Sequence, residues 1–320
     1  SKGPDHHYNI KTVENFPKDF KFYRSNVEEM TIGMMITIFN YKNVWVIANN
    51  NSIEDVDYSI DVKRTIGNGL GSCWTSIFSK KQDIPITIKD HIYVLDFISK
   101  EYNNTWPCST FELYLLTVID KKTGKEISPF IVDDISKNLG FARPKHKIIT
   151  SKRSLSSFMK GVRIPARGVI VSNNDIRIKI PNTLYYSIKS ANEAGDHIKP
   201  IHIAKIFLAC DDDTVLEVIA RTFPDYSNYL DLFNKTMDKI WYDLATTWGL
   251  TRQFADNTAK FTKAVSVHPL SHLLFMYKNG KIRTFKEGIK KLSAHRLVNI
   301  TKKKYRAEFK NNIKQLKGEM

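Results

Sequence analysis

The sequence predicts an α+β protein in two parts: a sheet-rich domain over residues 1–187 and an all-helical domain over residues 188–320. Up to Pro181, apolar and β-branched residues often alternate with polar ones, the two-residue period typical of strands. After Pro181, apolar residues recur at three- and four-residue spacings, the period of an amphipathic helix. We expect a mixed or antiparallel sheet in the first domain, and 320 residues leave room for both domains.

Composition indicates a soluble globular protein in a reducing, intracellular compartment. The chain is 42% hydrophobic and 26% charged. No apolar run approaches the ~20 residues of a membrane span, and the first ten residues contain no apolar signal region, so no membrane partner is expected. Cys73, Cys108 and Cys210 stand singly, which favours neither disulfides nor a metal site.

The charge favours nucleic acid as a partner. The chain has 49 Lys and Arg against 33 Asp and Glu, a net charge of +16. From Tyr277 onward there are 14 basic residues against three glutamates. Such an excess is typical of polyphosphate binding, and the alternative is a lysine-rich segment that only interacts with solvent. The candidate RNA-binding residues are Lys263, Lys278, Lys281, Arg283, Lys302, Lys303, Lys304 and Arg306.

Residues 28–39 suggest what the first domain is built around. An acidic pair is followed by Met30, Ile32 and Gly33, and then by an apolar strand. This layout resembles the Lys-x-(Asp/Asn)-Gly motif of ATP-dependent RNA ligases, specifically the phage-type RNA ligase 1 and tRNA-repair family with its nucleotidyltransferase fold. In that family the lysine amine attacks the α-phosphate of ATP. Met30 takes the place of the lysine and Ile32 that of the acidic or amide residue, so only Gly33 is kept.

Further elements of this resemblance follow in the family's order. Lys2, His6 and Asn9 fall on an Arg-Gly-x-x-Lys-Phe-Phe-Asn element, with Lys2 for the arginine and His6 for the lysine. Ser52 follows a strand at residues 44–48, where a Ser-Lys-x-Ser element has lost its lysine. The resemblance implies that these residues and Phe111 face a nucleotide.

The remaining elements lie on three predicted strands. Asp96 replaces the glutamate of a Phe-Glu-Phe motif, and the sequence aligns without a gap from there to Gly124. Arg167 stands where the resemblance implies a glutamate that organises metal and ribose, and it points inward if Val169 and Val171 share its face. The alternative, which we favour, is that Arg167 turns outward and that apolar side chains such as Met30 and Ile32 fill the pocket. Arg177 and Lys179 match a final Lys-x-Lys motif.

Two other patterns have more ordinary explanations. Lys121 has nucleophile-like spacing to Gly124, but no buried strand follows it, so we expect a hairpin tip. His268 and His272 are four residues apart with no acidic third ligand nearby, so we expect core or capping histidines and no metal site.

The helical half extends the resemblance. Its continuous helices are expected to include residues 252–263, 285–297 and 302–316, and residues 252–297 resemble the tRNA-facing domain of phage RNA ligases. The resemblance spans residues 1 to about 297, and an N-terminal portion that precedes the Arg-Gly element in the family is expected to be missing here.

The residues that differ from the family's motifs stand almost entirely at positions that carry its catalytic chemistry. Three hypotheses about function follow. The first, which we favour, is a ligase-like protein that has lost adenylation, needs no cofactor and binds tRNA or broken RNA ends. Its role is protective, competitive with a nuclease or toxin, or structural in a larger ribonucleoprotein. The second is an active ATP- and Mg-dependent RNA ligase whose lysine has been replaced by Met30. The third is a protein-interaction module on a ligase fold.

Overall fold

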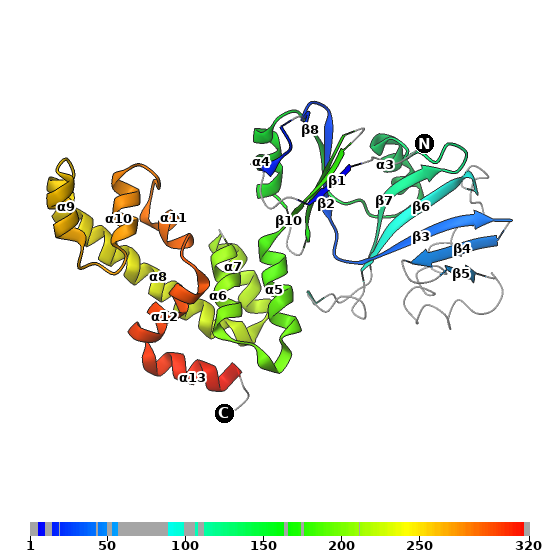
Figure 1. Cartoon of the computed structure of the whole chain (residues 1–320). Coiled ribbons are helices and arrows are strands. Elements are labelled where there is room, and N and C mark those ends of the chain that lie inside the picture. Colours follow the sequence, from blue (N-terminus) through cyan, green and yellow to red (C-terminus); the bar gives the residue numbers. More distant parts are fainter. Residues whose placement is uncertain are drawn as a thin grey trace. The chain divides into compact units, whose positions relative to one another are not determined.

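The computed structural model describes residues 6–9, 15–18, 20–42, 44–49, 53–56, 89–98, 106–107, 112–162, 166–173, 176–210 and 212–316. The chain divides into two compact units, Ser1–Tyr186 and Ser187–Met320. The first unit contains two five-stranded sheets and the second consists of helices (Figure 1). The predicted α+β class with a helical C-terminal part is therefore confirmed.

The first sheet has the strand order β1-β10-β9-β2-β8. Its strands are β1 His6–Asn9, β2 Ser25–Met30, β8 His146–Ile149, β9 Gly168–Ser172 and β10 Ile176–Pro181. Only the β1–β10 pairing is parallel. One face carries Val27, Val171 and Ile178 into a core shared with helix α4, Lys152–Lys160. The alternate positions, among them Glu28 and Lys179, lie on the other face.

The second sheet is antiparallel, with the order β5-β4-β3-β6-β7. Its strands are β3 Met34–Tyr41, β4 Val44–Asn49, β5 Ile53–Val56, β6 His91–Ile98 and β7 Glu112–Asp120. Ile36, Leu95 and Leu115 form its core together with Val132 of helix α3, Pro129–Leu139. The strand predicted after Gly33 is β3, and β4 returns as the second strand of the expected hairpin.

The helical unit is organised around α8, Pro224–Thr251, which contacts α6, α7, α11, α12 and α13. The other helices are α5 Thr183–Glu193, α6 Pro200–Ala209, α7 Asp213–Thr222, α9 Thr258–Val265, α10 Ser271–Lys278, α11 Phe285–Lys290, α12 Ala294–Lys304 and α13 Arg306–Leu316, with single 3₁₀ turns at Gly195–His197 and Arg252–Phe254. No helix among the described residues is long and apolar enough to cross a membrane.

The predictions of continuous helices over residues 252–263, 285–297 and 302–316 were wrong, because each range is interrupted. Asn257 accepts a hydrogen bond from Lys260 N, so α9 begins there and residues 252–254 form a separate turn. Ser293 caps α12 in the same way and separates it from α11. The non-helical backbone of Tyr305 ends α12 before α13. Helices α3 and α4 were not predicted, because each is short and interrupts a strand-rich region.

Candidate functional site

The segment from Met30 to Gly33 links β2 of the first sheet to β3 of the second. Met30 is half-buried at the end of β2. Ile32 is 6% exposed and packs in a cluster with Ile98 and Tyr185. The two positions that the resemblance assigns to a nucleophilic amine and its polar neighbour therefore carry a thioether and a buried hydrocarbon. Neither group can form a phosphoramidate.

Side chains hold both main-chain polar groups of Gly33. Its N–H donates to Oδ2 of Asp96 at 2.7 Å, and its carbonyl accepts from the guanidinium of Arg167. Asp96 is itself buried, at 5% exposure. A Cβ at Gly33 would lie 2.3 Å from the carbonyl oxygen of Phe97, so the approach of β6 requires glycine here. Asp96 and Arg167 thus fasten the segment that begins β3.

Arg167 lies just before β9 and is anchored through its main chain. Its N–H donates to Met30 O at 2.8 Å, and its carbonyl accepts from Asn182 N at 2.7 Å. Val169 and Val171 are buried in the core of the first sheet, whereas the Arg167 guanidinium reaches Gly33. The Arg167 guanidinium therefore turns toward Gly33 and not outward, and Ile32 is buried in the adjoining apolar cluster.

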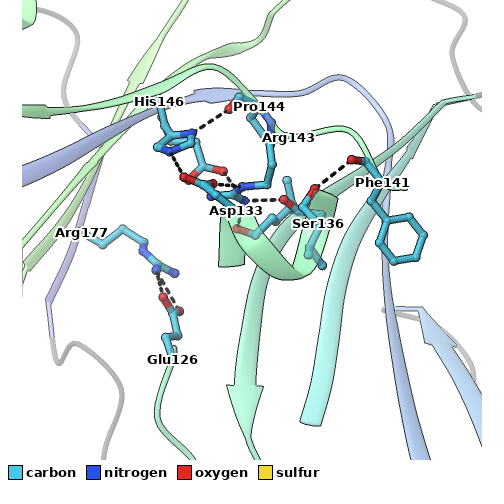
Figure 2. Close-up of polar contacts among 11 residues, drawn as sticks. Glu126, Asp133, Ser136, Phe141, Arg143, Pro144, His146 and Arg177 are labelled. Atoms are coloured by element: carbon cyan, nitrogen blue, oxygen red, sulfur yellow. Dashed lines mark hydrogen bonds and ion pairs between the residues drawn. The ribbon is translucent and has the colours of Figure 1, made fainter. Parts of the chain in front are cut away.

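Arg177 and Lys179 share one face of β10, as predicted, but differ in their surroundings. The Arg177 guanidinium contacts both carboxylate oxygens of Glu126 at 2.9 Å (Figure 2). Lys179 is exposed. Because Glu126 follows β7 of the second sheet, this ion pair joins the two sheets and neutralises one of the two cations.

A second polar network connects the sheets around Arg143 (Figure 2). Nε of Arg143 donates to Asp133 Oδ1 on α3 at 2.9 Å, and Nη1 donates to the carbonyls of Leu115 and Leu116 on β7. On the first sheet, Oε1 of Glu28 lies 3.9 Å from Arg143 Nη1. The sequence offered no signal for this network beyond Glu28, the first residue of the acidic pair before Met30.

His146 and Glu28 are neighbours across the β2–β8 pairing. Nε2 of His146 lies 3.0 Å from Asp133 Oδ2, and Nδ1 lies 3.1 Å from Pro144 O. An ionised carboxylate and a carbonyl both accept hydrogen bonds, so the two bonds can form together only when both ring nitrogens carry a proton. Burial raises the pKa of Glu28 to about 7, although electrostatic attraction to Arg143 and His146 opposes the rise. This network therefore contains a carboxyl group that exchanges its proton near neutral pH.

The side chains of five other candidates for the nucleotide site lie outside the described part of the structure. Lys2, Ser52 and Phe111 lie outside the described residues. His6 and Asn9 belong to β1, where their backbones pair with Ile176 and Lys179, and their side chains lie outside the described set.

Mg-ATP adenylation needs a nucleophilic amine and anionic groups beside the metal, and the resemblance assigns these places to Met30, Ile32 and Arg167. Among the described residues, no group of three or more His, Cys, Asp or Glu side chains could hold a metal ion. A guanidinium occupies the place of the expected metal-organising carboxylate. Lys121 lies in the turn after β7, as expected of a hairpin tip, and its ammonium group donates to the carbonyls of Asn40 and Lys89. Partial burial lowers the pKa of this lysine.

The eight candidate RNA-binding residues of the helical unit fall into two groups. Lys278 and Lys304 have partners: Lys278 donates to Thr258 Oγ1 at 3.2 Å, and Lys304 forms an ion pair with Asp243 at 2.6 Å. The exposed group comprises Lys263, Lys281, Arg283, Lys302, Lys303 and Arg306. Nδ1 of His268 accepts a hydrogen bond from Leu270 N at 3.0 Å, just before α10, and burial lowers the pKa of this histidine.

Comparisons with known proteins give structural similarities only. No protein-family model matches the chain, and a search of curated proteins found no match. An archaeal ATP-dependent RNA ligase matches with a TM-score of 0.45 and 11% identity over 75% of this chain and 67% of its own. A Naegleria gruberi RNA ligase mutant with ATP and Mn gives 0.41 and 10% over 56% of each chain. A putative ATP-dependent DNA ligase from Aquifex aeolicus gives 0.43 and 12% over 87% and 68%.

Proposed function

We propose that this protein binds RNA, with tRNA or broken RNA ends as its ligands, on a ligase-like scaffold that no longer transfers nucleotides. The proposed loss of nucleotide transfer is supported by the hydrogen bonds at Gly33. Asp96 and Arg167, which the resemblance assigns to nucleotide and metal handling, instead hold the main chain of Gly33. Ile32 is buried in the adjoining apolar cluster.

The exposed cations of the helical unit support the RNA-binding part. Lys302, Lys303 and Arg306 are exposed where α12 meets α13, and no ion pair joins them to another described residue. Together with a net charge of +16, they offer phosphate contacts that need no catalytic lysine. A protein of this kind would shield an RNA end from a nuclease or hold it in a larger assembly.

Filter binding of intact tRNA and of tRNA cleaved in the anticodon loop tests the proposal. If four to six phosphates are neutralised, log affinity should fall with log salt at a slope of roughly −0.7 per single-strand contact, about −3 to −4 in all. The double variant Lys302→Glu/Lys303→Glu should weaken binding and flatten the slope. An equal effect from Lys152→Glu/Arg153→Glu, an exposed basic pair on α4, would contradict a helical RNA site.

Charge reversal is preferable to truncation here. Removal of residues 298–320 would be expected to spare the fold if they formed a solvated tail, but Phe309 is 3% exposed and its ring packs edge-on against Tyr229 at 5.5 Å. Thr301 is also buried. Helices α12 and α13 are therefore part of the core of the helical unit.

A further inference from the structure

One exposed surface of the helical unit combines aromatic rings with unpaired cations. On α8, Lys235, Lys239, Tyr242 and Thr246 are four, three and four residues apart and so lie on one face of the helix. Tyr242 is 66% exposed, far more than a tyrosine that serves only as core packing. We name Lys239, Tyr242, Lys302, Lys303, Tyr305 and Arg306 the α8 strip.

Two contacts bring the ends of this surface together. Lys304 of α12 is ion-paired with Asp243, the residue after Tyr242, at 2.6 Å. Nζ of Lys239 lies 5.9 Å from the ring centroid of Tyr305. Residues 302–306 are therefore held against the middle of α8, although they are 60 or more residues away in sequence.

Paired charges leave a positive excess on this surface. Asp243 is neutralised by Lys304, and Asp231 forms an ion pair with Lys235 at 2.8 Å. Lys239, Lys302, Lys303 and Arg306 are exposed and have no ion pair with a described residue. Two exposed carboxylates, Asp238 and Glu308, also lie along this surface without such a pair, so four cations there outnumber two anions. An exposed ring bordered by such cations has the chemistry that single-stranded nucleic acids require: a face for stacking a base and ammonium or guanidinium groups for the flanking phosphates.

We propose that the α8 strip binds single-stranded RNA, with an unpaired base stacked on Tyr242 and phosphates contacted by Lys302, Lys303 and Arg306. This inference rests on the proposed function and adds to it the form of RNA that is bound. A duplex keeps its bases stacked inside and can offer this surface only its phosphates. The strip should therefore prefer an unpaired stretch, such as a cleaved loop, to a helical stem.

The test compares a labelled oligouridylate with an RNA duplex of the same length, by fluorescence anisotropy at fixed salt. The wild-type chain should bind the single strand more tightly. Tyr242→Ala should weaken single-strand binding by about fivefold or more while leaving duplex binding unchanged, since stacking is worth roughly 1–3 kcal/mol per base. Tyr242→Phe should restore it. Trp241→Ala is the matched control, because Trp241 is 50% exposed but lies about 100° around the helix.

The outcomes separate the two proposals. RNA binding that Tyr242→Ala and Trp241→Ala reduce equally, or that Tyr242→Ala does not reduce, overturns the stacking inference and leaves the proposed function standing. Failure of the wild-type chain to bind either RNA overturns both. Polyglutamate of matched charge serves as a competitor. If it displaces the oligouridylate as well as unlabelled oligouridylate does, the strip is a site for an acidic protein and the inference is wrong.

Discussion

Replacing Asp96 with alanine tests whether this carboxylate now serves the fold. The change removes the acceptor 2.7 Å from Gly33 N and leaves that N–H buried beside β6. A lost hydrogen bond to a charged group costs about 1.5–3 kcal/mol. For a unit of this size, each 1 kcal/mol lowers the melting temperature by roughly 2–4 °C, so we expect a decrease of about 3–12 °C for the first unit.

The control is Asp96→Asn, which keeps an acceptor oxygen on a side chain of the same length. It should lose only the contribution of the charge, about 1 kcal/mol. Melting followed by circular dichroism, with urea titration for the free energy, measures both variants. An Asp96→Ala protein that melts within 1 °C of wild type would refute this reasoning, and the carboxylate would then be free for a ligand.

Three further predictions concern the same region. Gly33→Ala should destabilise the first unit by about 1–3 kcal/mol or prevent its folding, because the new Cβ would lie 2.3 Å from Phe97 O, whereas Gly249→Ala, with no atom within 4 Å, should not lower the melting temperature. In calorimetric titrations, ATP should bind neither wild type nor Arg167→Glu tightly in a magnesium-dependent way; such binding by wild type would restore the enzyme hypothesis. Because the pKa of Glu28 rises on folding from 4.5 to about 7, the folded chain holds the extra proton between these values, so its free energy of unfolding should fall by about 3 kcal/mol as pH increases across them. In urea titrations Glu28→Gln should lack that component, and identical pH profiles for the two proteins would contradict it.

The sequence predicted the elements whose periodicity is local. The apolar alternation of residues 34–39 and 92–98 identified β3 and β6, and the three- to four-residue spacing after Pro224 identified α8. Helix ends set by a single cap, such as Ser293, were missed because a polar residue inside an amphipathic pattern carries no unique signal.

The site was predictable as a set of positions but not as a set of contacts. Gly33 meets Asp96 from 63 residues away and Arg167 from 134 residues away, and no local pattern encodes such a meeting. The Arg143 network was missed for the same reason, since Glu28 lies on β2 of the first sheet and Asp133 lies on α3, which was not predicted. Tyr242 and its neighbour Trp241 are both exposed aromatic residues, and no local pattern tells which of them lies beside residues 302–306.

The central claim is that the scaffold has lost nucleotidyl transfer, and a covalent-labelling experiment tests it most directly. The protein is incubated with α-labelled ATP and magnesium, denatured, and examined for label that remains attached. We predict none, since Met30 has no amine and the ammonium group of Lys121 is bound by two carbonyls. We also predict none for Met30→Lys alone, because Ile32 and Arg167 still occupy the places of polar and acidic groups. Stable label on a lysine of the wild-type chain would contradict the claim.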